Sequence, residues 1–359
     1  MQSKNNPYFA SLDGLRAFSI LSVILYHAAS KTGWINHFHG WLGVDIFFVL
    51  SGFLITFLLC REKRDTGGVD LGAFYIRRAF RILPVYAAVL LVYVVLTGFS
   101  ANAEKWHQFA LNLPFYLSFM NEYAHTTNGG AVFGYTWTLG VEEKFYLLWP
   151  FLLFVALAAN RWKRGILAAL YLGLIALAPV RYEEARSYSG LLVGCFLALA
   201  LSSERPAWIW QRIRRIPVIV PFGLVIFGFW LIDRGGKSYL FVFSWMMAIL
   251  VAHLLTTPSW LRTILSHDVL TWLGKRSYGM YLVHGLALDA VRKVPHLSSS
   301  LLVTFCTFGV SAFLADGMFR LIESPARNLG KRWLQSRKAP HYRRSTSETM
   351  VLVDASEAN

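Results

Sequence analysis

The strongest constraint in this sequence is a series of long apolar segments separated by short polar ones. About 20 consecutive apolar residues are enough to cross the hydrocarbon core of a bilayer as one helix. The chain is 55% hydrophobic over 359 residues, which exceeds the usual share in a soluble domain. We therefore predict an all-α, polytopic membrane helix bundle with about ten transmembrane helices. Their approximate bounds are 12–29, 41–59, 79–99, 137–159, 165–179, 188–201, 217–232, 239–256, 269–290 and 301–322.

The lysines and arginines indicate how the bundle is oriented. They give the chain a net charge of +15. They recur in the short segments between the apolar runs, as topology signals do, so we expect no nucleic-acid partner. A cytoplasmic N-terminus places a large excess of them on the inner side, and we predict that both termini are cytoplasmic. Residues 1–328 then form the transmembrane domain, and 329–359 form a polar, disordered cytoplasmic tail.

The first apolar segment carries two polar side chains, Arg16 and His27, on one helix face. Eleven helical residues separate them by about 16–17 Å, roughly half of the hydrocarbon core. A charged residue inside a spanning helix normally faces the bundle interior and marks a functional pathway. In the alternative interpretation, Arg16 reaches the inner headgroups and His27 is a hydrogen-bonded histidine at the interface.

The predicted topology brings further ionisable side chains toward the outer half of the bundle. Histidine is the usual general base, and a carboxylate can fix its tautomer and stabilise the imidazolium. Spacings of four and three place Ser277 on one helix face with a tyrosine and a histidine of the same segment. The candidate catalytic residues are His27, Asp45, Glu142, Glu143, Tyr281 and His284.

An arginine group lies at the opposite, cytoplasmic edge. Guanidinium groups match the geometry of phosphate oxygens, so we predict a site for a large phosphate-bearing donor. Coenzyme A fits, because its long thin arm ends in a thioester that could reach the histidine. Positive-inside placement alone would also explain the arginines, and Glu143 and Lys144 could be simple interfacial charges. The arginines are Arg16, Arg77, Arg78 and Arg81.

Two other groups of residues are not expected to carry chemistry. Ser51 does not lie in a Gly-x-Ser-x-Gly motif, so we do not expect it to be a nucleophile. With Gly52 it forms a small pair that would let two helices approach closely. The three cysteines show no Cys-x-x-Cys spacing, and we expect neither a metal site nor a disulfide framework.

Five sequence blocks together resemble the acyltransferase-3 family of integral-membrane acyltransferases. They occur in the order expected for that family, and they cover residues 12 to about 328. The blocks are Leu12-Asp-Gly-Leu-Arg-Ala with His27, Gly43-Val-Asp-Ile-Phe-Phe-Val-Leu-Ser-Gly-Phe-Leu-Ile, Arg77-Arg-Ala-Phe-Arg-Ile-Leu-Pro-Val-Tyr, Trp137-Thr-Leu-Gly-Val-Glu-Glu-Lys-Phe-Tyr and Ser277-Tyr-Gly-Met-Tyr-Leu-Val-His.

The resemblance implies a membrane bundle that transfers acyl groups, usually acetyl, from cytoplasmic acyl-coenzyme A to a hydroxyl of an extracytoplasmic or lipid-linked glycan. The family's Arg-x10-His signature falls on Arg16 and His27. Its arginine block, aspartate and acidic pair fall on Arg77, Arg78, Arg81, Asp45, Glu142 and Glu143. The chain departs from the family's more usual Trp-Ser-Leu-Ser-Val-Glu-Glu-Gln-Phe-Tyr pattern at Gly140 and Lys144. We expect the added cation to alter the charge of the acidic pair or to favour an anionic acceptor.

Our main hypothesis is a membrane O-acyltransferase. His27, oriented by Asp45 or Glu142, deprotonates a sugar hydroxyl or first takes the acyl group itself. A thioester is already activated, so positioning and base catalysis suffice. The developing oxyanion needs a donor, for which Tyr281 or Trp137 is a candidate. The residues expected to bind the substrate are Trp137 and Ser277.

The expected partners follow from this hypothesis. They are membrane lipid, a glycan or lipid-linked saccharide acceptor, and acyl-coenzyme A (acetyl-coenzyme A above all) as co-substrate, with no permanently bound cofactor. The expected location is the bacterial plasma membrane. The alternative is a proton-coupled transporter or flippase of a glycan or small anion, in which the same ionisable side chains relay protons. A membrane scaffold or receptor is a third class, but it would not need such a cluster.

Overall fold

A computed structural model describes residues 8–29, 39–100, 102–127, 132–158, 183–202, 207–295, 297 and 299–337. Within these residues every regular element is a helix, which confirms the all-α prediction for this part of the chain. The principal helices are α1 (Ala10–Ala28), α2 (Leu42–Thr66), α3 (Leu71–Gly98), α4 (Ala103–Leu117), α5 (Asn121–Thr127), α6 (Trp137–Ala158), α8 (Glu183–Ser202), α9 (Ala207–Arg215), α10 (Ile219–Gly235), α11 (Leu240–Thr256), α12 (Trp260–Leu265), α13 (Asp268–Arg292) and α14 (Ser300–Met318). Short elements are η2 (Gly134–Thr136), η4 (Gly236–Tyr239) and η5 (Phe319–Glu323).

The apolar segments predicted from the sequence coincide with helices wherever the structure describes them. The segment at 165–179 lies outside the described residues. Among the described residues, four helical stretches are long and apolar enough to cross a membrane: Leu42–Thr66, Leu71–Gly98, Ile219–Thr256 and Ser300–Arg337. The third comprises α10, η4 and α11. These stretches support a membrane protein, whereas the larger number of spans and the cytoplasmic termini stay predictions.

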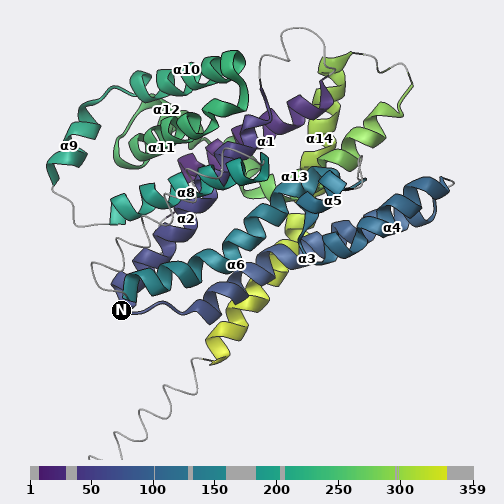
Figure 1. Ribbon diagram of the computed structural model, residues 1–359, viewed down its shortest axis with the longest axis horizontal. Helices are drawn as coiled ribbons and strands as arrows, with labels where there is room; N and C mark the ends of the chain where they lie inside the picture. The colour runs from purple at the N-terminus through teal and green to yellow at the C-terminus, as the bar shows by residue number, and fades with distance from the viewer. Residues whose placement is uncertain are drawn as a thin grey trace, which may run out of the picture.

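Helix α1 lies at the centre of the bundle (Figure 1) and packs against α2, α12, α13 and α14. On one side α2 packs along α8, and on the other α13 packs along α14. Helices α3 and α6 contact each other and complete the part of the bundle that encloses the candidate site.

A short turn sets the position of the arginine block relative to α2. Gly67 ends α2 with φ +79°, a left-handed conformation that favours glycine. Three residues later the Asp70 carboxylate caps α3 by accepting a hydrogen bond from the Ala73 amide at 2.8 Å. The arginines that follow Asp70 therefore lie in the first turns of α3, next to the helix that the chain has just left.

Helices α2 and α8 approach each other at glycine positions. A Cβ added at Gly52 would overlap the Leu191 carbonyl, and one added at Gly194 would overlap the Val49 carbonyl. The two helices thus meet backbone to backbone, as small residues allow in membrane bundles. The sequence-based expectation of a close helix approach at Gly52 is confirmed.

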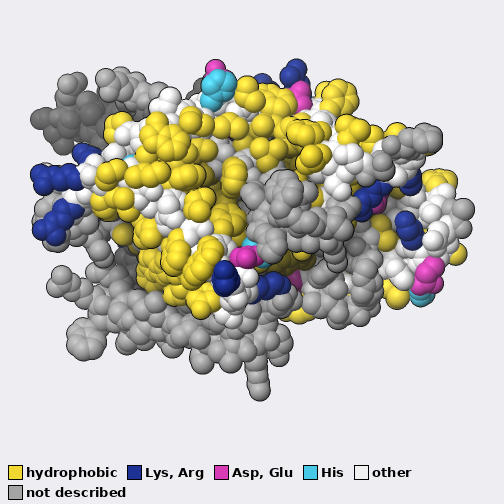
Figure 2. All heavy atoms as spheres, turned by 90° about the horizontal axis from the view of Figure 1, so that it is seen from above, with side chains coloured by type: hydrophobic (Ala, Val, Ile, Leu, Met, Phe, Trp, Pro, Cys, Tyr) yellow, Lys and Arg dark blue, Asp and Glu magenta, His cyan; other side chains and the backbone are white. Residues whose placement is uncertain are grey.

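The outer surface of the bundle is largely apolar. Figure 2 shows a broad hydrophobic band across one face, with most charged side chains near its edges. Large side chains stand exposed on several helices, among them Leu91 on α3, Phe151 on α6 and Phe313 on α14, the last with 79% exposure. Such a surface is stable against lipid and unfavourable in water.

The C-terminal helix extends beyond the predicted end of the domain. After the π-helical segment Phe319–Glu323 the chain stays helical to Arg337. Gly330 lies against the Phe80 ring of α3, and this contact gives the extension a partner. The prediction of a disordered tail is therefore wrong for 329–337, and residues 338–359 lie outside the described part.

The α2–α8 contact can be tested by substitution. Gly52→Val should lower the free energy of unfolding by about 1–3 kcal/mol, because the helix backbones must move apart. The measurement is the unfolding midpoint of the purified protein in detergent. Gly309→Ala is the control, since a Cβ there meets nothing within 4 Å. Equal midpoints for the two variants would contradict the close approach.

Candidate functional site

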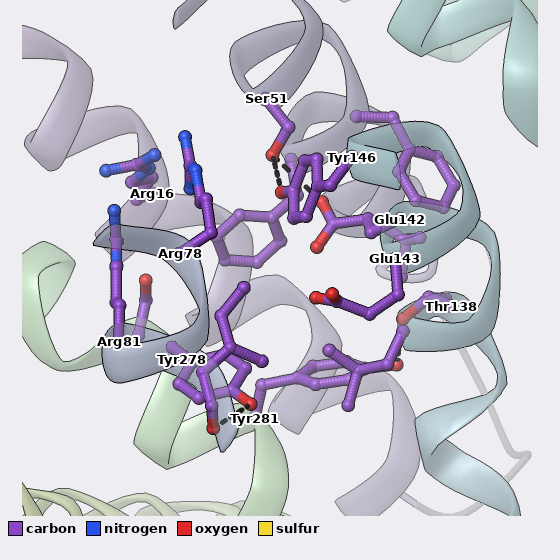
Figure 3. Close-up of a pocket in the computed structure, with 16 residues that line it drawn as sticks. Arg16, Ser51, Arg78, Arg81, Thr138, Glu142, Glu143, Tyr146, Tyr278 and Tyr281 are labelled. Atoms are coloured by element: carbon purple, nitrogen blue, oxygen red, sulfur yellow. Dashed lines mark hydrogen bonds between the residues drawn. The ribbon is translucent and has the colours of Figure 1, made fainter. Parts of the chain in front are cut away.

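Five helices form the walls of a polar pocket inside the bundle (Figure 3). The walls come from α1, α2, α3, α6 and α13. Its polar and charged lining side chains are Arg16, Ser51, Arg78, Arg81, Thr138, Glu142, Glu143, Tyr146, Ser277, Tyr278 and Tyr281. A pocket lined by side chains from distant parts of the sequence is the usual setting of a binding or active site.

The charges in the pocket stand on facing walls. In Figure 3 the guanidinium groups of Arg16, Arg78 and Arg81 lie on one side, and the carboxylates of Glu142 and Glu143 lie on the other. Within the described residues no ion pair joins the two groups, and neither Arg78 nor Arg81 has an ion-pair partner. Both guanidinium and carboxyl groups are therefore available to a ligand.

One carboxylate is held by a chain of hydroxyl groups. The Tyr146 hydroxyl donates to the Ser51 hydroxyl at 3.1 Å, and Ser51 donates to Glu142 Oε1 at 2.9 Å. The Arg78 guanidinium lies over the Tyr146 ring, 4.9 Å from its centroid. The neighbouring carboxylate differs, because Glu143 Oε1 is buried and has no hydrogen-bond partner among the described residues.

Tyr281 closes one end of the pocket. Its hydroxyl is 2.6 Å from the Thr138 hydroxyl and also donates to the Tyr135 carbonyl. A tyrosine hydroxyl has one proton, and a carbonyl can only accept, so Thr138 must donate in the first of these bonds. In this conformation the Tyr281 hydroxyl has no proton left for a substrate oxyanion.

His27 and His284, here called the histidine pair, lie beyond Tyr281 and outside the pocket lining. Their ring centroids are 5.2 Å apart, and the Tyr135 ring lies 4.7 Å from His27 and 5.1 Å from His284. His284 Nδ1 donates to the Tyr281 carbonyl at 2.6 Å. In the neutral ring Nε2 is then the acceptor nitrogen, and it is buried with no hydrogen-bond partner in the described residues.

An apolar layer separates the histidine pair from the arginines. On α1, Ala17, Ile20 and Val23 lie between Arg16 and His27, and each is 0% exposed. They pack in one cluster with Leu139 of α6 and Met280 of α13. The polar pocket and the histidine pair are thus two compartments in this structure, with Tyr281 between them.

The structure corrects the predicted grouping of the carboxylates with His27. Glu142 and Glu143 share the pocket with the arginines, and no described contact joins either of them to His27. The reason is helix rise. Tyr135 touches His27 just before α6 begins, and five residues of helix from Trp137 to Glu142 advance about 7–8 Å toward the arginine side. The sequence predicts the depth of these carboxylates in the membrane only to within half of the bilayer thickness.

Three other candidates lie outside the pocket. The pocket-facing side of α2 carries Val44, Phe47 and Ser51. Asp45 follows Val44 and is turned about 100° away from it around the helix. Its side chain is 4% exposed and interacts electrostatically with Lys237. Arg77 points outward, with its guanidinium 3.4 Å from the Glu62 carboxylate. Trp137 is partly buried against an apolar cluster that α6 forms with α2, α3 and α8. Ser277, by contrast, lines the pocket as its predicted substrate contact would require.

Sequence reasoning missed several of the hydroxyl groups of the pocket. It set Ser51 aside because no nucleophile motif surrounds it, yet Ser51 contacts Glu142 directly. It gave no role to Tyr146 or Tyr278, which also line the pocket. Helical spacing could have found Tyr146, which follows Glu142 by four residues and so shares its helix face. The described residues contain no group of three or more His, Cys, Asp or Glu side chains that could hold a metal ion.

Comparison with known proteins identifies the family to which the chain is similar. Residues 9–319 match the family model described as an acyltransferase domain, of the acyltransferase-3 type. No solved structure matches the chain.

Several curated bacterial proteins are similar over most of the chain. A Staphylococcus aureus (strain MRSA252) protein named "Putative O-acetyltransferase" is 29% identical over 98% of this chain. A Bacillus subtilis (strain 168) protein named "Putative peptidoglycan O-acetyltransferase" is 31% identical over 98%, and a Listeria monocytogenes "Peptidoglycan O-acetyltransferase" is 30% identical over 91%. The chain spans only 63%, 60% and 57% of the lengths of these relatives, respectively.

The hydroxyl chain in the pocket predicts an energetic coupling. Ser51→Ala and Tyr146→Phe should each cost about 1–2 kcal/mol of unfolding free energy, because each leaves a polar partner without its hydrogen bond. The double variant should cost less than the sum by about 0.5 kcal/mol or more. Unfolding curves of the four proteins in detergent give the coupling energy. Ser118→Ala, an exposed hydroxyl bonded to its own helix backbone, is the control. Strict additivity would show that the chain does not act as a unit.

Proposed function

The chain belongs to the acyltransferase-3 family, and from this premise we propose that it is a membrane O-acyltransferase that transfers an acyl group, acetyl above all, from acyl-coenzyme A to a hydroxyl of a glycan. The family match makes acyl transfer the reaction class. The names of the relatives, among them a peptidoglycan O-acetyltransferase, favour a glycan hydroxyl as the acceptor. The donor, the acceptor and the residues that act are our proposal.

The observation that carries the donor site is the arginine wall of the pocket. Arg16, Arg78 and Arg81 line one cavity, and Arg78 and Arg81 have no carboxylate partner among the described residues. Unpaired guanidinium groups inside an apolar bundle are costly unless an anion joins them. The phosphates of coenzyme A supply such an anion, and the bidentate guanidinium geometry suits them.

The histidine pair supplies the base in this proposal. The acceptor oxygen attacks the thioester carbonyl carbon, and its proton passes to a histidine nitrogen. The carbon–sulfur bond then breaks, and the coenzyme A thiolate takes the proton as it leaves. His27, beside the buried acceptor nitrogen of His284, is the residue to which we assign the proton transfer.

Acyl transfer then requires the closed end of the pocket to open. The thioester must pass from the arginine side to the histidine pair, and Tyr281 with Thr138 closes that route here. Rotation of the Tyr281 side chain breaks its two hydroxyl bonds and frees its proton. The same motion would let Tyr281 donate to the oxyanion, which reconciles its present bonds with that role.

The proposed orientation follows from the donor. Acyl-coenzyme A is a cytoplasmic metabolite, so the arginine side faces the cytoplasm and the histidine pair faces outward. In a multi-pass protein of the bacterial plasma membrane, the acceptor then approaches from the outer side or within the lipid. Both termini lie on the cytoplasmic side in this arrangement.

Adjacent arginines test the donor site, because only one of them lines the pocket. Arg78→Gln should raise KM for acetyl-coenzyme A about tenfold or more, as a charge-assisted contact is lost. Arg77→Gln should raise it far less, since Arg77 pairs with Glu62 on the exposed side. The measurement is transfer of labelled acetyl to the glycan of membrane vesicles that carry each variant. Equal effects at the two positions would contradict the assignment of the pocket.

The role of the histidine pair is tested by His27→Ala. This variant should lose acetyl transfer by about 100-fold or more while it still inserts in the membrane, because the base is removed. His107→Ala, an exposed histidine on α4, is the control and should retain activity. Normal product from the His27 variant would refute the role. Movement of substrate across vesicles without consumption of acetyl-coenzyme A would favour a carrier instead.

A further inference from the structure

An ion pair with one buried partner lies on the far side of α6 from the pocket. The Glu122 carboxylate on α5 forms an ion pair with the Lys144 ammonium group on α6. The Glu122 side chain is only 6% exposed, and the Lys144 side chain is 28% exposed. Lys144 therefore points away from the pocket, toward α5. The described ion-pair partner of Lys144 is thus Glu122 and not the acidic pair of Glu142 and Glu143.

A glycine makes room for this carboxylate. Gly140 precedes Lys144 by one helical turn, so the two face the same side of α6. A Cβ at Gly140 would overlap Glu122 Oε2 and would lie 2.9 Å from the Phe119 carbonyl oxygen and 3.1 Å from the Asn121 nitrogen. Gly140 and Lys144 are two of the three positions, with Thr138, at which this block departs from the family pattern. The position of the Glu122 carboxylate accounts for both residues, because Gly140 leaves space for it and Lys144 compensates its charge.

The residue next to Glu122 connects the ion pair to the wall of the histidine compartment. The Asn121 side-chain amide donates to the Thr136 hydroxyl at 2.8 Å and to the Tyr86 hydroxyl at 3.0 Å. Thr136 directly follows Tyr135 in η2. Asn121 is fully buried, so both bonds are shielded from water.

Tyr135 connects η2 to the histidine pair and to Tyr281. Its ring contacts both histidines, and its carbonyl accepts the hydrogen bond from Tyr281. The fit is tight on the α13 side, because a Cβ added at Gly285 would lie 2.6 Å from the Tyr135 ring. A small shift of η2 would therefore move the histidine pair or release Tyr281.

We propose that Glu122 and Lys144 are positioning residues for acyl transfer. Their ion pair holds α5 against α6, Asn121 fixes η2 to α5, and η2 places Tyr135 against the histidine pair and Tyr281. This inference rests on the proposed function, because it assigns the pair to the transfer step and not to donor binding. The arginine wall contacts none of these residues in the described contacts.

Because Glu122 is more deeply buried than Lys144, we expect the two single substitutions to have unequal effects. Removing Lys144 leaves the nearly inaccessible Glu122 carboxylate uncompensated, which is the costly case. Removing the Glu122 charge leaves Lys144, whose flexible chain is more exposed and can turn toward polar surroundings. Replacing both by glutamine restores a neutral amide pair of similar shape.

The experiment compares Lys144→Gln, Glu122→Gln and the double variant in the full chain in lipid nanodiscs. Labelled coenzyme A counts the donor sites per protein, and transfer from acetyl-coenzyme A gives the rate per occupied site. Lys144→Gln should keep the number of donor sites and lower the rate about 10- to 100-fold, as a misplaced reacting group does. Glu122→Gln should lose less. The double variant should return to within about threefold of the wild type.

Two further variants sharpen the test. Gly285→Ala displaces Tyr135 directly and should reproduce the Lys144→Gln phenotype, namely intact donor sites with slow transfer. Asp65→Asn breaks an exposed ion pair with Arg61 and should change neither quantity.

The inference is overturned if Lys144→Gln transfers at the normal rate, if the double variant is as slow as Lys144→Gln, or if donor sites are lost in proportion to the rate. The last outcome would mean that the ion pair only keeps the protein folded. If the wild type neither binds nor consumes acetyl-coenzyme A, both the proposed function and this inference are wrong. Normal wild-type transfer with unaffected variants removes this inference alone.

Discussion

Three guanidinium groups face two carboxylates across one pocket inside an apolar helix bundle, and much of the structure keeps these charges in place. Buried charges are costly, so each must be compensated by partners, hydrogen bonds or a ligand. Arg16 has Asp13 at 3.3 Å, and Glu142 has the hydroxyl chain that begins at Tyr146. The remaining groups lack such partners among the described residues. A site in this condition is poised to gain stability from a charged ligand.

The separation of the pocket from the histidine pair is the second organising feature. An apolar layer on α1 and the hydroxyl bonds of Tyr281 divide the interior into a charged compartment and an imidazole compartment. This division has a chemical use for an acyltransferase. If the proposed donor is a thioester and the histidine pair is the base, a closed layer between them would protect the thioester from hydrolysis until an acceptor is present. The backbone links the two compartments directly, because His284 holds the carbonyl of the tyrosine that closes the pocket.

Support for both compartments comes from outside them. Glycines let α2 and α8 meet at their backbones, which fixes the wall that carries Ser51. On the other side, the ion pair between Glu122 and Lys144 joins α5 to α6 near Tyr135. Both devices act at a distance from the reacting groups, yet a shift of about 1 Å at such supports is enough to misalign a catalytic site.

The sequence by itself determined the helical class, the approximate bounds of most helices, the family and the residue types of the site. Apolar length and motif order carry that information locally, as the overlap of α2 and α3 with their predicted segments illustrates. Only the tertiary structure decided which of those residues share a compartment. Helix rotation turned Asp45 and Arg77 away from the pocket, and helix rise moved Glu142 away from His27. Rotation and relative depth depend on packing between helices, which no single segment encodes. The pairing of Glu122 with Lys144 could not be predicted from the sequence for the same reason, because it depends on how α5 packs against α6.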